Sequence, residues 1–180
     1  MRVYHYLEAK WALDDIRRRR LKVSKIDDLN DPYEFACVHS IDRASQIALD
    51  KTRSEGCEKY GALCFSRIWN SILMWSHYGD RHKGLCLGFD VLEDLVRPVE
   101  YVREVLAVGN LMFEELNDEW NAEGVRIVDR LLGGKYDGWS YEQEVREHAE
   151  RAEMDGQATH RRCCPRLFRG REDRQGRMLG

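Results

Sequence analysis

Residues 70–90 read NSILMWSHYGDRHKGLCLGFD, and this stretch decides the fold. It begins apolar, turns polar and aromatic, and closes on a run in which large apolar side chains alternate with other residues. The pattern predicts an amphipathic helix over residues 69–77, ended by Gly79, and a buried strand over residues 84–90. The junction between them is either catalytic or a densely packed corner.

The polar centre of this stretch, Ser76, His77 and Tyr78, invites a catalytic interpretation. Adjacent side chains on a helix do not face one another, however, so Ser76 and His77 do not form a nucleophile–base pair. Trp75 and Tyr78 share one helical face, and we expect this face to be buried against a sheet. His77 is kept as a possible wall of a ligand-binding cleft.

The same patterns predict the elements on either side. We expect strands at residues 2–6, 21–24, 61–66, 98–105 and 139–148, and helices at residues 8–20, 41–59 and 110–132. Residues 139–148 carry both patterns, and the alternation of Tyr141, Gln143 and Val145 leads us to predict a strand there. The expected fold is α+β, with a mixed, mostly antiparallel sheet and three to four helices in one globular domain over residues 1–150.

Composition narrows the class of protein. The chain has 180 residues, of which 43% are hydrophobic and 34% charged, as in globular proteins. No apolar run approaches the roughly 20 residues of a membrane span. The N-terminus lacks the apolar core of a signal peptide, so we expect a cytoplasmic protein that makes no membrane contact. The six cysteines have no CxxC or CxxH spacing, which favours buried thiols and no metal site.

Residues 151–180 have a different composition. They carry eight arginines, no lysine and four acidic residues, a net charge of +4, whereas residues 1–150 carry −7. With little periodicity, this segment is predicted to be a divergent or disordered tail. Contact between the basic tail and nucleic acid is a second interpretation, and translation of a shifted reading frame is a third.

Three blocks of the chain resemble a known family. They are HYLEAKWALDDIRRRRLKVSKIDDLNDPYEF (residues 5–35), CFSRIWNSILMWSHYGDRHKGLCLGFD (residues 64–90) and WSYEQEVR (residues 139–146). Their order and spacing are similar to those of the bacterial domain-of-unknown-function 2971 family. The resemblance covers residues 1–150, and the family's name assigns no activity.

The opening order of a His-Tyr strand, a helix and a strand also distantly resembles ADP-ribosyltransferase-like folds, which include toxin and phage-defence enzymes. This resemblance implies NAD as a substrate, no metal, a ribose contact on the first strand and a catalytic Glu-x-Glu pair near the end. The resemblance implies His5 or Arg2 on the first strand, Ser24 or Ser66 on a later strand, and Glu142 and Glu144 near the end. We take Glu144, Glu142 and His5 as the candidate catalytic residues. The candidate cofactor-binding residues are Arg2, Tyr6, Ser24, Asn30, Asp31, Ser66 and His77.

The transferase hypothesis has a physical rationale. Cleavage of the glycosidic bond of NAD builds positive charge on the ribose, and a carboxylate beside it stabilises that charge. On a strand, Glu142 and Glu144 point to one face while Gln143 points away. The simpler interpretation is that Glu144 only pairs with Arg146 or with an arginine of the first helix.

The loop at residues 30–32 and the class of the whole chain each allow more than one interpretation. Asn30, Asp31 and Pro32 either present a ligand-binding loop or serve as a turn in which Asx side chains bond nearby backbone. The chain is either an enzyme or a non-catalytic module that binds a ligand or an operon partner. A nuclease is a weaker third class, because no acidic cluster has metal-binding spacing.

Overall fold

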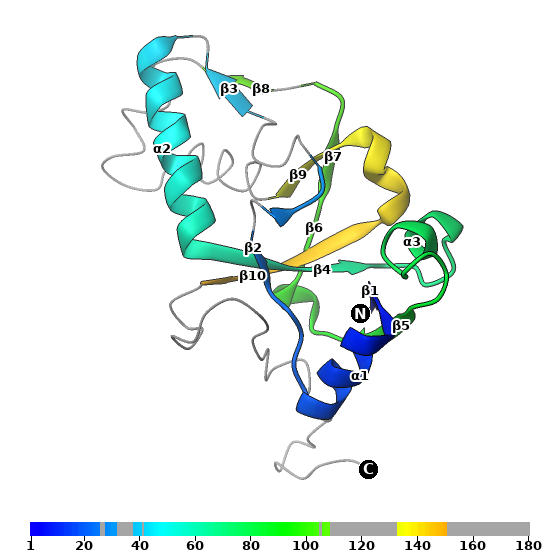
Figure 1. Cartoon of the computed structure of the whole chain (residues 1–180). Coiled ribbons are helices and arrows are strands. Elements are labelled where there is room, and N and C mark those ends of the chain that lie inside the picture. The colour runs from blue at the N-terminus through cyan, green and yellow to red at the C-terminus, as the bar shows by residue number, and fades with distance from the viewer. Residues whose placement is uncertain (26–27, 32–37, 41, 105, 109–132, 151–180) are drawn as a thin grey trace.

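The structure is a computed structural model of the whole chain, which describes residues 1–25, 28–31, 38–40, 42–104, 106–108 and 133–150 (Figure 1). The helix predicted over residues 110–132 and the tail predicted over residues 151–180 lie outside the described residues.

A six-stranded antiparallel sheet forms the centre of the described part (Figure 1). Five strands follow the order β5–β1–β4–β10–β6, and β2 pairs with β4 outside this path. The strands are β1 (Arg2–Leu7), β2 (Ser24–Lys25), β4 (Tyr60–Ser66), β5 (Leu85–Asp90), β6 (Arg97–Pro98) and β10 (Glu144–Glu150). The last described strand, β10, therefore lies inside the sheet, between β4 and β6.

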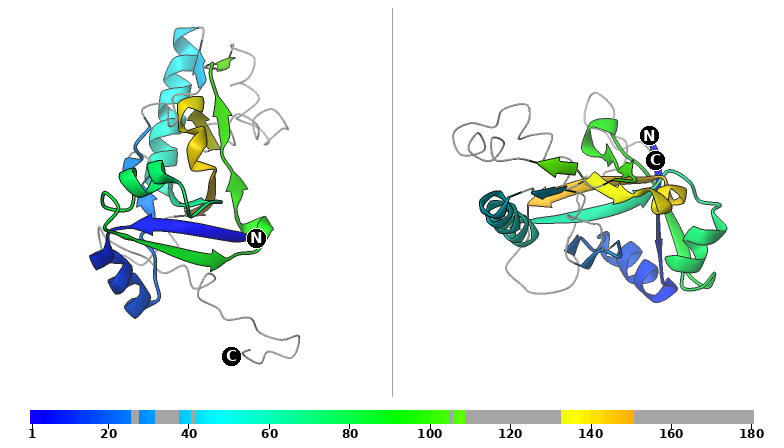
Figure 2. Two further views of the ribbon diagram at one scale, coloured as in Figure 1. Left: turned by 90° about the vertical axis from the view of Figure 1, so that its right-hand side faces the viewer. Right: turned by 90° about the horizontal axis from the view of Figure 1, so that it is seen from above.

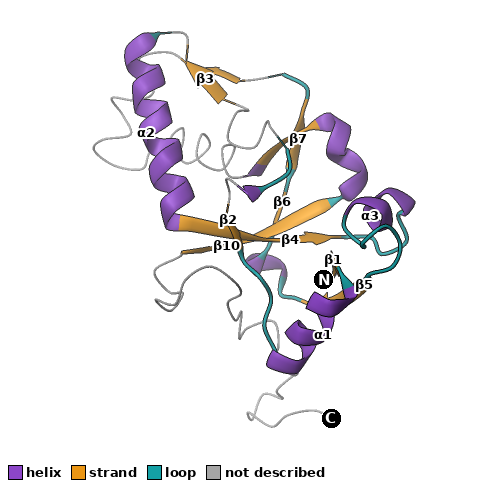
Figure 3. Cartoon of the chain, viewed as in Figure 1, coloured by secondary structure: helices purple, strands orange, loops and turns teal. Residues whose placement is uncertain are grey.

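Two short parallel pairs accompany this sheet. The first joins β3 (Val38–Ser40) to β8 (Leu106–Val108), and the second joins β7 (Glu100–Val102) to β9 (Gly134–Tyr136). The described helices are α1 (Ala9–Arg18), α2 (Arg43–Lys59), α3 (Ile72–His77) and the 3-10 helices η2 (Glu93–Leu95) and η4 (Asp137–Glu142) (Figure 3). The helix α2 lies at one end of the sheet, and α1 and α3 lie towards the other (Figures 1 and 2). The α+β fold with a mostly antiparallel sheet is confirmed.

Local chemistry sets the ends of α1 and α3. The helix α1 ends where Arg19 enters the left-handed region with φ 49°, so it stops two residues before the predicted end at residue 20. The helix α3 begins after Ser71, whose Oγ accepts a hydrogen bond from the backbone N–H of Met74 at 3.3 Å. Residues 69–71 therefore precede this helix, although the sequence predicted them inside it.

The core fills one face of the sheet. Its buried members come from alternate positions of the central strands, from the segment after β5 and from the segment between α1 and β2. They are Val3, Leu21, Leu63, Phe65, Phe89, Val91, Val96 and Val145. Because side chains alternate along a strand, the residues between these positions point to the opposite face. That second face carries most of the candidate site, which Phe65 of the core also lines. Trp75 packs edge-on against Tyr6 with ring centroids 5.2 Å apart, but both Trp75 and Tyr78 are only half-buried.

The strand predicted over residues 139–148 is wrong in its first half. Residues 137–142 form η4, Gln143 adopts a left-handed conformation with φ 46°, and β10 begins only at Glu144. The break is held in place because the N–H of Glu144 donates to the hydroxyl of Tyr101 at 2.8 Å, while its carbonyl accepts from Val99 at 3.0 Å. Glu142 and Glu144 therefore do not lie on one strand.

Two more of the predicted strands are corrected. Residues 21–24 contribute only Ser24 to β2, which continues to Lys25. The predicted strand 98–105 is interrupted at Val99, which separates β6 from β7 and whose N–H donates to the carbonyl of Glu144 at 3.0 Å.

Candidate ligand-binding site

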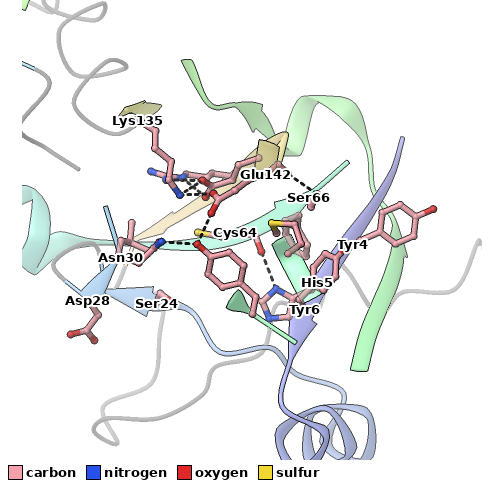
Figure 4. A pocket seen from close by; sticks show the side chains of 16 residues that line it. Tyr4, His5, Tyr6, Ser24, Asp28, Asn30, Cys64, Ser66, Lys135 and Glu142 are labelled. Atoms are coloured by element: carbon pink, nitrogen blue, oxygen red, sulfur yellow. Dashed lines mark hydrogen bonds and ion pairs between the residues drawn. The ribbon is translucent and has the colours of Figure 1, made fainter. Parts of the chain in front are cut away.

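A cavity of about 260 Å³ lies over the second face of the sheet (Figure 4). Ser66 of β4 stands opposite Tyr4 of β1 on one side and opposite Glu144 of β10 on the other. Side chains at alternate positions share a face, so these three strands present one continuous row of polar and aromatic groups. The cavity is lined by Tyr4, His5, Tyr6, Ser24, Asp28, Leu29, Asn30, Cys64, Phe65, Ser66, Met74, Tyr78, Lys135, Glu142, Glu144 and Arg146.

Four charged side chains form a buried network at one wall of this cavity. The Nζ of Lys135 lies 2.6 Å from Oε2 of Glu142 and 3.0 Å from Oε2 of Glu144. The guanidinium of Arg146 binds Glu144 twice, from Nε at 2.7 Å and from Nη2 at 3.0 Å. All four side chains are at most 6% exposed. Two negative and two positive charges cancel, which is the condition under which charged groups tolerate burial.

The two carboxyl groups differ in protonation behaviour. Burial opposes ionisation of Glu144, but the charge and hydrogen bonds of Arg146 and the charge of Lys135 outweigh it and lower its pKa to about 2. Burial raises the pKa of Glu142, and the nearby ammonium of Lys135 offsets this only in part. Glu142 is thus the carboxyl group whose charge a bound ligand can change.

Tyr78 and Asn30 extend the network towards the cavity mouth. The hydroxyl of Tyr78 donates to Oε1 of Glu142 at 2.5 Å and accepts from Nδ2 of Asn30 at 2.6 Å. Burial and the adjacent charge of Glu142 raise the pKa of Tyr78, so the phenol stays protonated. Both oxygens of Glu142 therefore have fixed partners, and the side chain is held in one orientation.

His5 closes a gap in the sheet beneath the cavity. The strand β1 pairs with β4 only at Tyr4 and Ser66, and beyond this point Nδ1 of His5 bonds to the carbonyl oxygen of Cys64 at 2.9 Å. A carbonyl only accepts, so Nδ1 carries the proton. Burial lowers the pKa of the ring. The neutral ring therefore offers Nε2 as an acceptor, which has no hydrogen-bond partner among the described residues.

Three further predicted residues line the cavity, and two of them have engaged hydroxyl groups. The hydroxyl of Ser66 donates to the carbonyl of Glu142 at 2.6 Å, and that of Tyr6 donates to the carbonyl of Ile68 at 2.9 Å. Ser24 lies opposite Ala62 at the edge of the same face. Ser66 therefore positions η4, and Tyr6 positions the segment that leads to α3.

The structure places three predicted site residues outside the cavity. Arg2 is exposed and pairs with Asp90 at 2.8 Å. Asp31 is buried and accepts from the backbone N–H of Tyr136 at 2.8 Å, which ties its loop to β9. His77 is exposed, and its ring lies 6.1 Å from each of the rings of Trp139 and Tyr141.

Sequence patterns did not reveal Lys135 or the contact of Tyr78 with Glu142. Lys135 stands in GGKYDG, a turn-forming cluster in which a lysine is expected to be solvated, so no local signal marks it. The prediction that Glu144 pairs with Arg146 is confirmed, and this pair is buried.

Among the described residues, no group of three or more His, Cys, Asp or Glu side chains is arranged to hold a metal ion. No helix within the described ranges has the length and apolar character needed to cross a membrane. The cavity instead offers carboxylate, amide, hydroxyl and imidazole groups beside aromatic rings, which suits an organic ligand that has hydroxyl groups and a flat ring.

These features define an α+β protein whose central sheet carries a ligand-sized cavity with a neutralised, buried glutamate pair. Residues 74–147 match the family described as "Protein of unknown function (DUF2971)", which confirms the resemblance over the third block and most of the second, whereas the first block, residues 5–35, lies outside the match. The matched segment contains Tyr78, Lys135, Glu142, Glu144 and Arg146, so the charged wall of the cavity lies wholly within it. Neither the curated proteins nor the solved structures gave a match. The resemblance to ADP-ribosyltransferase-like folds stays a prediction.

Proposed function

We propose that this protein is an NAD-dependent enzyme of the ADP-ribosyltransferase-like kind, with Glu142 as its catalytic carboxylate. The observation that carries the proposal is that Glu142 and Glu144 line the same cavity as His5 and Tyr6 of β1. A first-strand histidine and a Glu-x-Glu pair are the parts that the resemblance to these enzymes implies. A phage-defence or toxin system in the cytoplasm, with an operon partner, is the setting that we infer for such an activity.

Glu142 suits the catalytic role better than Glu144. Both oxygens of Glu144 are occupied by Arg146, and one of them also by Lys135. Glu142 has one contact per oxygen, with Tyr78 and Lys135, and a carboxylate oxygen accepts a second hydrogen bond. Glu144 therefore acts as a positioning residue that holds Lys135 and Arg146 in place.

The proposed step breaks the bond between the ribose C1 and the pyridinium nitrogen of NAD. The electron pair of this bond moves to the ring nitrogen and gives neutral nicotinamide, while positive charge develops on the ribose. Glu142 stabilises this charge electrostatically. A nucleophile from water or from an acceptor molecule then forms a bond to C1 and loses a proton. A developing cation beside Glu142 favours its ionised form, which opposes the effect of burial on its pKa.

His5 contributes by binding and not by proton transfer. Its Nε2 is an unprotonated acceptor, so it suits a ribose hydroxyl, which donates. The lowered pKa keeps the ring neutral, and this avoids a second positive charge beside the developing cation.

A non-catalytic binding module is the second candidate, and one observation favours it. Every charge of the buried network already has a partner of opposite sign within 3.0 Å. Such self-neutralised clusters also occur as purely structural features. In that case the cavity binds a small ligand and performs no chemistry.

Nicotinamide release separates the two candidates. The purified chain is incubated with NAD, with and without cell extract, and nicotinamide is quantified by chromatography. We expect Glu142→Gln to lower the rate at least ~100-fold, the scale of one lost electrostatic catalytic group, while NAD binding measured by saturation-transfer NMR persists. The matched control is Glu147→Gln, which removes a charge from β10 on the face opposite the cavity.

The two candidates predict different results. A wild-type chain that neither binds nor cleaves NAD contradicts the proposal and favours the binding module. Undiminished cleavage by Glu142→Gln removes Glu142 from the catalytic role.

A further inference from the structure

The turn between α3 and β5 has an unusual backbone. Asp80, Arg81 and His82 adopt positive φ angles of 47°, 53° and 68° in succession. Left-handed backbone is strained for residues other than glycine, and such strain persists where the surrounding structure imposes it. Glycine would make the same turn without strain. The side chains at these positions therefore need an explanation other than chain reversal.

The hydrogen bonds of this turn leave two donors unused. The N–H of His82 donates to the carbonyl of Trp75, that of Lys83 to Asp80 and that of Gly84 to Gly79. Within the described part of the chain, the N–H groups of Asp80 and Arg81 donate no hydrogen bond. Two neighbouring free N–H groups in a turn of this kind form a site to which an anion can bind.

The side chains of the turn add positive charge. Arg81, His82 and Lys83 are exposed, and none of these side chains has a hydrogen bond or ion pair with any described residue. Asp80 offsets one of the two positive charges of Arg81 and Lys83, so the turn carries a net charge of +1. Residues 1–150 as a whole carry a net charge of −7. Two cationic side chains and two N–H donors are the groups that bind phosphate oxygens.

We propose that the turn Asp80–Lys83 binds the phosphate or diphosphate group of a ligand. Its position supports this, because Tyr78, which lines the cavity, lies only two residues before Asp80. Gly84 fixes the far end of the turn: a Cβ there would clash with the carbonyl oxygen of Leu7, so the chain passes tightly against the end of β1.

The cavity is too small for a whole dinucleotide, so a phosphate site beside it would bind the part of the ligand that lies outside. Pockets for small molecules typically measure ≈ 300–1,000 Å³, and this cavity of about 260 Å³ holds one half of a dinucleotide and not the whole. The diphosphate of NAD would then lie at or outside the mouth. This identification of the ligand as a dinucleotide rests on the proposed function, whereas the phosphate site itself does not.

The test uses inorganic pyrophosphate as the probe, and the full chain. Binding is followed by phosphorus NMR line broadening at low ionic strength. We expect the double variant Arg81→Gln/Lys83→Gln to weaken binding ~10-fold, the scale of one or two charge-assisted hydrogen bonds. The matched control is Arg17→Gln/Lys22→Gln, which removes two exposed cations that, like Arg81 and Lys83, have no partner among the described residues. The control is expected to leave binding unchanged.

A second variant tests the role of the backbone. Arg81→Gly relieves the left-handed strain, so we expect a higher melting temperature together with weaker pyrophosphate binding. Equal losses in the control and in Arg81→Gln/Lys83→Gln would overturn the proposal, and so would the absence of pyrophosphate binding in the wild-type chain. Failure of nicotinamide release with pyrophosphate binding intact would count against the NAD chemistry alone.

Discussion

Removal of the Lys135 ammonium is the sharpest test of the buried network. Lys135→Met keeps the length and apolar stem of the side chain but leaves Arg146 as the one cation of the network. The net charge of the buried group falls from zero to −1. Breaking a buried ion pair by removing one partner typically costs 3–5 kcal/mol. At roughly 2–4 °C per kcal/mol for a chain of this size, the melting temperature should fall by about 10 °C.

The chain contains a matched control for this substitution. Lys10 also lies beside a carboxylate, Glu8 at 2.9 Å, and over a tryptophan ring, Trp11 at 4.7 Å, but its side chain is 66% exposed. Lys135 likewise contacts carboxylates and lies over a tryptophan ring, that of Trp139 at 5.2 Å, but its side chain is buried. Exposed pairs contribute about 0–1 kcal/mol, so Lys10→Met should leave stability nearly unchanged.

Urea unfolding followed by tryptophan fluorescence measures both variants, at pH 7 and pH 5. The pKa of Glu142 is already raised by burial, and loss of Lys135 raises it further. A carboxyl group with a raised pKa destabilises the fold when it is ionised and ceases to do so once it is protonated. The destabilisation of Lys135→Met should therefore shrink as the pH falls from 7 to 5. A midpoint equal to that of the wild type at pH 7 would refute the idea that Lys135 neutralises the pair.

Three more predictions concern residues that hold the site and the neighbouring turn in place. Tyr78→Phe removes the donor to Glu142 and should lower the free energy of unfolding by about 1–3 kcal/mol, measured by urea titration. Glu144, with a pKa near 2 in the folded state against an ordinary 4.5, contributes stability above pH 4.5 that should be lost as the pH falls towards 2 in acid titrations followed by circular dichroism. Gly84→Ala drives a Cβ into the carbonyl oxygen of Leu7 and should cost at least ~2 kcal/mol in the same urea titration.

Each of these has a control within the chain. In Gly88→Ala the atoms nearest to the new Cβ belong to the guanidinium of Arg2, at 2.7 Å, and this flexible side chain can shift, so the substitution should be tolerated. Equal losses at Gly84 and Gly88 would contradict a tight passage of the chain at Gly84. Glu144→Gln should flatten the acid transition that the wild type shows between pH 4.5 and 2. Tyr141→Phe removes a hydroxyl that makes no hydrogen bond among the described residues and should leave stability nearly unchanged, in contrast to Tyr78→Phe.

The sequence predicted the elements that have strong periodicity and failed on the short ones. The alternation of residues 84–90 and the apolar run of residues 61–66 correspond to β5 and β4, because each buries one face against the core. The parallel pair β3–β8 has only three residues per strand, too few to show a period. Residues 139–142 alternate like a strand, yet nothing in the sequence marks Gln143 for the left-handed conformation that ends η4.

The candidate site was predicted in part, and by partly wrong geometry. Glu142 and Glu144 do line one cavity, but they come from a 3-10 helix and a strand and not from one face of a strand. Sequence patterns could not predict that Lys135 is their partner, because its burial depends on two carboxylates that contact it only in the folded chain. Asn30 and Asp31 are neighbours with different positions: one lines the cavity mouth and the other anchors the loop.

The central place of β10 determines when the site can exist during folding. Asn30 and Tyr78 are 48 residues apart in sequence, and Tyr78 and Glu142 are 64 apart, so these contacts close long loops and form late. During synthesis, the carboxylate wall is incomplete until residues 144–150 have left the ribosome and paired with β4 along seven positions. Before that moment β4 presents an open strand edge, which is prone to pairing with other chains. A nascent chain of this protein therefore lacks the charged wall of the cavity and is exposed to aggregation until its last described strand is made.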